Sequence, residues 1–161
     1  MDFGGRYHFA ADRPAVWAAL NDVQVLKAVI PGCEYIAWTG PNSLELRIKV
    51  NLGIVHPTFT GDLVLSNVHP AESYVLTGRG RGGMLGLAHG AARIRLEDDP
   101  RDGTLLSFAA EGQADGGIMR LGRALIGKSA QRVIDGFFES IGHQMGAIVT
   151  ALPPPEDPPH F

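Results

Sequence analysis

The sequence contains a single cysteine, Cys33, and it lacks both a long apolar run and an excess of positive charge. One cysteine excludes an internal disulfide and favours a reducing compartment. No stretch reaches the roughly 20 consecutive apolar residues that a membrane-spanning helix needs, and residues 1–6 carry no apolar signal region. The net charge of −3 argues against a dedicated nucleic-acid binder, which normally has a strongly basic balance. We therefore expect a cytoplasmic protein that binds no nucleic acid.

Motifs for metal and phosphate chemistry are also missing from the sequence. The six histidines are scattered, and none forms a close pair with another ligand of metal-binding type. The glycine-rich segment 78–83 resembles a phosphate loop only superficially, because another predicted strand follows it instead of a helix. We therefore expect neither a bound metal nor a cofactor.

Glycine, in contrast, is abundant, at 21 of the 161 residues. Much of it falls inside predicted strands, where glycine weakens pairing and leaves space beside the backbone. A chain of this length normally forms one domain and buries a core without disulfides. We expect a single domain over residues 1–152, followed by a Pro-rich, disordered tail over residues 153–161.

The predicted elements follow the order strand, two short helices, about six strands and a long helix. Asp12 and Asp22 are the expected N-caps of the short helices, the second of which ends near Val29. Alternation and turn residues predict strands over 3–9, 33–38, 44–50, 56–67, 73–81, 85–97 and 104–114. Tight turns between successive strands favour an antiparallel sheet. The expected fold is α+β: a curved antiparallel sheet of about six to seven strands wrapped around a long C-terminal helix.

The segment 115–152 carries the strongest signal in the chain. Its apolar residues recur at steps of three and four, which predicts one helix with a continuous apolar face. Asp115 is the expected N-cap, and Pro153 ends the run. Such a helix is about 50 Å long at about 1.5 Å per residue. A helix of this length against a curved sheet tends to leave a hollow.

The inward faces of the last three predicted strands lose side-chain bulk toward the same end of the sheet. A packed interior has few voids, so either helix side chains fill this space or a ligand does. We predict an apolar cavity that suits a lipid, polyprenyl or quinone-like molecule, with Tyr74 as the main inward polar residue. Its predicted lining is Phe59, Leu63, Tyr74, Leu76, Gly78, Gly80, Ala88, Gly90, Ala92, Phe108, Ala110, Gly112, Leu121, Leu125 and Phe137.

Two features beside this end of the sheet are candidates for a gate or a partner contact. Met84 and Leu85 sit between glycines at a hairpin tip, and Arg120 and Arg123 begin a basic strip on the polar side of the helix. An apolar tip and a basic strip suit a membrane surface or an acidic partner. The alternatives are that Met84 caps the core and that the arginines form an ordinary solvated face.

Local sequence extends these observations to a family. The runs Ile30-Pro31-Gly32-Cys33-Glu34, Phe59-Thr60-Gly61 and Gly116-Gly117-Ile118, the last leading to Leu121-Gly122, resemble the family of the carbon monoxide dehydrogenase G subunit (CoxG). That family belongs to the START-like (SRPBCC) helix-grip proteins. The resemblance implies an accessory to a molybdenum hydroxylase or carbon monoxide dehydrogenase, which it recruits to the membrane or supplies with quinone. It also allows transient, peripheral contact with the inner membrane.

Two other functions stay open at this stage. Related helix-grip proteins include cyclases, and a cyclase- or hydrolase-like enzyme would need at least two polar groups facing the cavity. Alternation instead places His89, Glu111 and Gln113 on the outer face of the sheet. A ligand-free assembly factor with a filled core is the third possibility. We expect a non-enzymatic protein.

Overall fold

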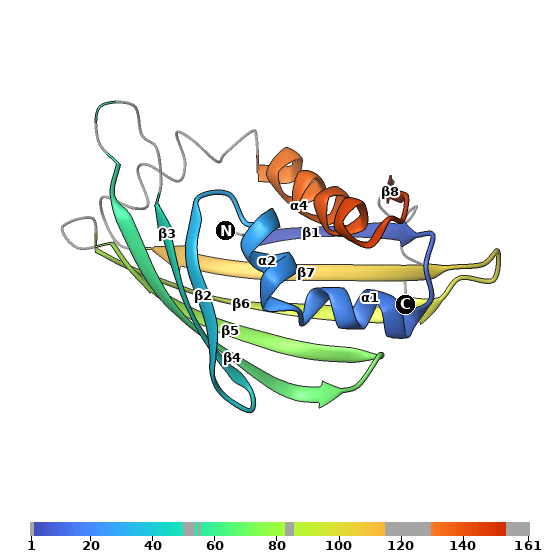
Figure 1. Ribbon diagram of the computed structural model, residues 1–161, viewed down its shortest axis with the longest axis horizontal. Helices are drawn as coiled ribbons and strands as arrows, with labels where there is room; N and C mark the ends of the chain where they lie inside the picture. The colour runs from blue at the N-terminus through green and yellow to red at the C-terminus, as the bar shows by residue number, and fades with distance from the viewer. Residues whose placement is uncertain (1, 50–53, 55, 83–85, 115–129, 154–161) are drawn as a thin grey trace, which may run out of the picture.

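The computed structural model describes residues 2–49, 54, 56–82, 86–114 and 130–153. One antiparallel sheet of eight strands, in the order β2-β3-β4-β5-β6-β7-β1-β8, curves around the described helices, which lie on its concave side (Figure 1). The elements are β1 (Asp2–Phe9), α1 (Arg13–Leu20), α2 (Val23–Val29), β2 (Cys33–Gly40), β3 (Ser43–Lys49), β4 (Thr58–His69), β5 (Ser73–Arg81), β6 (Leu87–Asp98), β7 (Thr104–Ala114), α4 (Ala130–Met145) and β8 (Val149–Leu152).

The α+β helix-grip fold expected from the sequence is confirmed, including the two short helices after the first strand. The carboxylate of Asp12 accepts a hydrogen bond of 3.0 Å from the backbone N–H of Ala15 at the start of α1. The carboxylate of Asp22 accepts one of 2.8 Å from the backbone N–H of Gln24 at the start of α2. Both aspartates satisfy backbone donors that a helix start leaves unpaired, which is why each short helix begins where it does.

The predicted C-terminal end of the long helix is wrong. Helix α4 ends at Met145, and Gly146 has a φ of 73°, a left-handed conformation that glycine adopts without strain. The chain then forms β8, an eighth strand that pairs antiparallel with β1. The free edge of β1 offers backbone partners to residues whose apolar spacing fits a helix and a strand equally well. The predicted helix start, residues 115–129, lies outside the described residues.

The strand register brings the small residues of three strands together. Gly78 on β5 pairs with Gly90 on β6, which in turn pairs with Gly112 on β7. The neighbouring inward row contains Leu76, Ala92 and Ala110. Because residues in one such row share a face of the sheet, bulk is missing from three adjacent strands at one end.

Large side chains fill the opposite end of the concave face. Tyr7, Phe9 and Leu106 from the sheet pack with Phe138 and Ile141 from α4, and all five are fully buried. The rings of Tyr7 and Phe138 are 4.5 Å apart between centroids. This cluster fixes α4 on the sheet. No helix in the described part of the chain combines the length and apolar character needed to cross a bilayer.

Candidate functional site

A cavity of about 310 Å³ lies between the described helices and the concave face of the sheet. We call it the helix-covered cavity. Its described lining side chains are apolar except Asn21 and Tyr74, and none of them carries a charge. The lining consists of Leu20, Asn21, Leu26, Ile30, Pro31, Ile36, Leu44, Leu63, Leu65, Tyr74, Leu76, Ala92, Ile94, Phe108, Ile134, Phe137 and Phe138. Its volume lies within the usual range for small-molecule sites, roughly 300–1,000 Å³.

A second hollow of about 450 Å³ continues along the same face of the sheet. The small residues of β5, β6 and β7 lie along one side of this hollow. We call the hollow the glycine wall. It shares Leu63, Leu76 and Ala92 with the helix-covered cavity, so the two spaces adjoin. Together they form a mostly apolar channel along the concave face.

The structure places most of the predicted ligand-contacting residues along these two spaces. Those on the glycine wall are Phe59, Leu63, Leu76, Gly78, Gly80, Ala88, Gly90, Ala92, Ala110 and Gly112. Tyr74, Phe108 and Phe137 line the helix-covered cavity. The predicted residues Leu121, Leu125, Met84, Leu85, Arg120 and Arg123 lie outside the described residues. Ligand contact by any of these residues stays a prediction.

Sequence reasoning missed the contribution of the two short helices and the first hairpin. Leu20 and Leu26, on α1 and α2, cover one side of the cavity, and Ile36 and Leu44, on β2 and β3, complete it. The sequence shows that these residues are apolar. It does not show which part of the sheet they cover, because a capped amphipathic helix does not specify the surface on which it packs.

Tyr74 is the buried polar side chain of this site. The residue is 6% exposed, and its ring packs edge-to-face with the ring of Trp17 at a centroid distance of 5.2 Å. Burial raises the pKa of the Tyr74 phenol well above its usual value, because the phenolate would lose its hydration. Tyr74 therefore stays protonated at neutral pH. It can donate a hydrogen bond into the cavity but is a poor general base.

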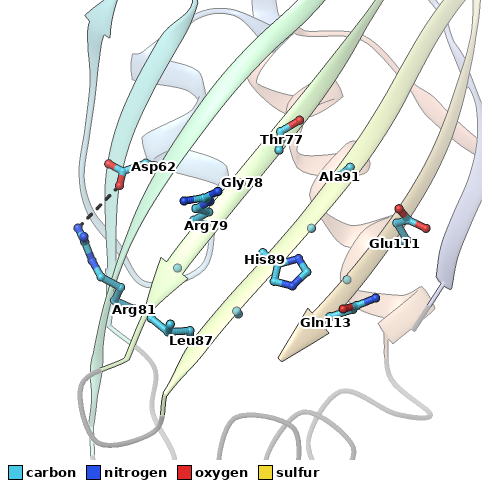
Figure 2. A pocket seen from close by; sticks show the side chains of 14 residues that line it. Asp62, Thr77, Gly78, Arg79, Arg81, Leu87, His89, Ala91, Glu111 and Gln113 are labelled. Carbon is cyan, nitrogen blue, oxygen red and sulfur yellow. Dashed lines mark ion pairs between the residues drawn. The ribbon is translucent and has the colours of Figure 1, made fainter. Parts of the chain in front are cut away.

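The outer face of the sheet behind the glycine wall has a different chemistry. Figure 2 shows Arg79, His89, Glu111 and Gln113 pointing away from the helices. Beside them, Arg81 lies 3.7 Å from the carboxylate of Asp62 in an exposed ion pair. Alternation along the strands thus keeps the charged groups outside and leaves the inner surface apolar. Within the described residues, no three His, Cys, Asp or Glu side chains gather as metal ligands.

Solved structures of similar fold support this architecture. A conserved protein from Geobacillus kaustophilus superposes with a TM-score of 0.79 at 20% identity, covering 92% of this chain and 99% of that chain. The Zhui aromatase/cyclase from Streptomyces sp. R1128 gives a TM-score of 0.65 at 16% identity, covering 91% of this chain and 93% of that chain. Identities this low show the fold alone.

A comparison with curated protein sequences gives no match. The sequence does match the family of the carbon monoxide dehydrogenase G subunit (CoxG), over residues 5–146. The matched segment runs from β1 past the end of α4, so it includes the described lining of the helix-covered cavity and, apart from Phe3, that of the glycine wall. The chain therefore belongs to the CoxG family, named for the G subunit of carbon monoxide dehydrogenase.

Proposed function

We propose that this protein is a non-enzymatic accessory protein that holds an apolar molecule, a lipid or a quinone, in the helix-covered cavity and the adjoining glycine wall. The observation that carries the proposal is the uncharged, almost wholly apolar lining of a cavity of about 310 Å³. Each 100 Å² of apolar ligand surface removed from water contributes about 2.5 kcal/mol to binding. A folded chain that keeps such a space beside its core is suited to receive an apolar guest.

Membership of the CoxG family supports the choice of partner. We propose that the protein serves a molybdenum-containing carbon monoxide dehydrogenase or a related hydroxylase, either by delivering quinone as the electron acceptor or by bringing the enzyme to the inner membrane. Transient membrane contact would let an apolar ligand enter without crossing water. The protein would then act in the cytoplasm.

The chemistry of the cavity favours a carrier over a cyclase-like enzyme. General acid–base catalysis needs a titratable group whose pKa lies near the working pH. Tyr74 is the ionisable residue among the described lining residues, and burial moves its pKa away from neutrality. Asn21 does not titrate.

Native mass spectrometry of gently extracted protein, before and after addition of decylubiquinone, tests the proposal. We expect one bound apolar molecule per chain, or stoichiometric uptake of the added quinone. Bare protein that takes up no quinone would contradict the carrier function. If that bare protein copurifies with the molybdenum enzyme, the ligand-free assembly factor is favoured instead, and chemical conversion of the ligand would favour the enzyme.

A substitution at Gly112 makes the test specific to the glycine wall. Among the described residues, the nearest atom to a Cβ built there is the carbonyl oxygen of His89 at 3.9 Å, so a Cβ at this position clashes with no described atom. Gly90 is a poorer choice, because its Cβ would lie 2.7 Å from the carbonyl oxygen of Glu111. We expect Gly112→Leu to reduce uptake and the control Ala109→Leu, at an exposed position of β7, to leave it unchanged.

A further inference from the structure

We propose that the Tyr74 hydroxyl is the polar anchor of the helix-covered cavity and that its ligand is a neutral apolar molecule with a carbonyl oxygen at the anchored end. The inference deepens the proposed function and rests on it. It selects, among lipids and quinones, those that present an uncharged carbonyl group.

The first observation is that the Tyr74 hydroxyl has no partner of its own. No hydrogen bond joins it to any residue in the described part of the chain. In the same part of the chain, no fully enclosed side-chain nitrogen or oxygen lacks a partner. The hydroxyl of this 6%-exposed residue therefore keeps some open surface, and the cavity is the open space that Tyr74 lines.

Tyr7 is a buried tyrosine of this fold whose hydroxyl does have a hydrogen-bond partner. It lies on β1, is fully buried, and its hydroxyl donates a hydrogen bond of 2.7 Å to Oδ1 of Asp135. The Tyr74 hydroxyl has no such bond to any described residue, and its open surface leaves it able to donate to a molecule in the cavity. A ligand that excludes water from the cavity must supply an acceptor for this donor, because a hydroxyl left enclosed without a partner costs roughly 1–3 kcal/mol.

The second observation is the chemistry of the surrounding lining. Tyr74 stays protonated and so offers a donor, and one N–H of the Asn21 amide already donates to the carbonyl oxygen of Trp17 at 2.9 Å. No Lys, Arg or His is among the described lining residues. A carboxylate or phosphate group would be buried without a counter-charge, which is strongly unfavourable. A carbonyl oxygen needs only one neutral donor, which the Tyr74 hydroxyl can provide.

Matched probes can test the anchor with the full chain. 2-Acetylnaphthalene and 2-ethylnaphthalene have nearly the same shape, but only the first carries a carbonyl oxygen. We would titrate both into the wild-type protein, Tyr74→Phe and the control Tyr7→Phe by isothermal calorimetry. We expect Tyr74→Phe to weaken binding of 2-acetylnaphthalene roughly tenfold, the effect of one hydrogen bond, and to leave 2-ethylnaphthalene within about twofold.

The control variant and the other outcomes show whether the anchor or the carrier function is wrong. Tyr7→Phe should leave the ratio of the two affinities unchanged, because Tyr7 does not line the cavity. Equal effects of Tyr74→Phe on both probes, or none on either, would overturn the anchor while leaving the carrier function intact. Failure of the wild-type protein to bind either probe would instead count against the carrier function. Binding of 2-naphthoate as tightly as 2-acetylnaphthalene would overturn the choice of a neutral ligand.

A spectroscopic measurement separates a direct hydrogen bond from a change in packing. The infrared carbonyl stretch of 2-acetylnaphthalene should lie at a lower frequency when bound to the wild-type protein or to Tyr7→Phe than in an apolar solvent. In Tyr74→Phe the frequency should return to its value in the apolar solvent. An unchanged carbonyl frequency in Tyr74→Phe would show that another group, or none, contacts the oxygen.

Discussion

Tyr7 on β1 and Asp135 on α4 are 128 residues apart in sequence and are joined by a hydrogen bond of 2.7 Å from the phenol to the carboxylate. The bond links β1, which lies between β7 and β8 at this residue, to helix α4. The Asp135 carboxylate faces the sheet through this bond, and the residue is half-buried.

Replacing Tyr7 with phenylalanine should lower the free energy of unfolding by about 1–2 kcal/mol. The ring and its contact with Phe138 remain, but the half-buried carboxylate of Asp135 loses a donor. Urea denaturation at pH 7 measures the change. An unfolding midpoint equal to that of the wild-type protein would show that the bond contributes nothing to holding α4 on the sheet.

Tyr74→Phe should change the response of stability to alkaline pH. Burial raises the pKa of Tyr74 in the folded protein, so the unfolded chain loses this proton first, near pH 10. The contribution to stability is therefore complete below about pH 10 and falls as the pH rises further. Between pH 9 and pH 11 the wild-type protein should lose about 1.4 kcal/mol more than Tyr74→Phe. Urea denaturation at both pH values tests this, and parallel losses would contradict the burial of the phenol.

Replacing each of two glycines of α4 with alanine should change the stability of the protein in opposite directions. A Cβ at Gly136 meets no described atom within 4 Å, so Gly136→Ala should stabilise the protein by up to about 1 kcal/mol through helix propensity. A Cβ at Gly142 would lie 2.8 Å from the carbonyl oxygen of Ala147 and against Val149 of β8. Gly142→Ala should therefore destabilise the protein. Thermal unfolding of the two variants provides the measurement, and changes of the same sign would contradict the close approach of β8 to α4.

A larger side chain where the two hollows meet should raise the stability of the protein and lower its ligand uptake. Ala92 lines both spaces, so Ala92→Leu adds apolar volume where the structure has room. We expect the free energy of unfolding of the ligand-free protein to rise by about 0.5–2 kcal/mol. We expect the affinity for decylubiquinone to fall about tenfold. The control Ala109→Leu, at an exposed position of β7 that lines neither space, should change neither the stability nor the uptake. Unaltered uptake by Ala92→Leu would place the ligand elsewhere.

Much of the fold follows from local patterns in the chain. Asp12 and Asp22 mark the starts of the short helices because their side chains satisfy unpaired backbone donors. Alternation predicts the inward rows, and hairpins between the last three predicted strands before the long helix predict that their small residues fall at one end of the sheet. The structure adds the register, in which Gly78, Gly90 and Gly112 pair across the three strands.

The errors lie where a pattern admits two structures. Ile148 and Val149 continue the apolar period of α4, yet the helix ends at Met145 and Ile148 is 76% exposed. Val149–Leu152 instead forms a strand because β1 presents an unpaired edge at that position. Only the completed sheet supplies that edge, so no local signal distinguishes the two outcomes.

The sequence by itself determined an α+β chain with capped short helices, antiparallel strands and an inner face that loses bulk at one end, because capping, alternation and turn formation act over a few residues. The tertiary structure decided where α1 and α2 close the cavity, that Tyr74 faces it without a partner among the described residues, and that Asp135 bonds Tyr7. These relations depend on how helices pack on the curved sheet. Packing is set by the shapes of surfaces that residues distant in sequence build together.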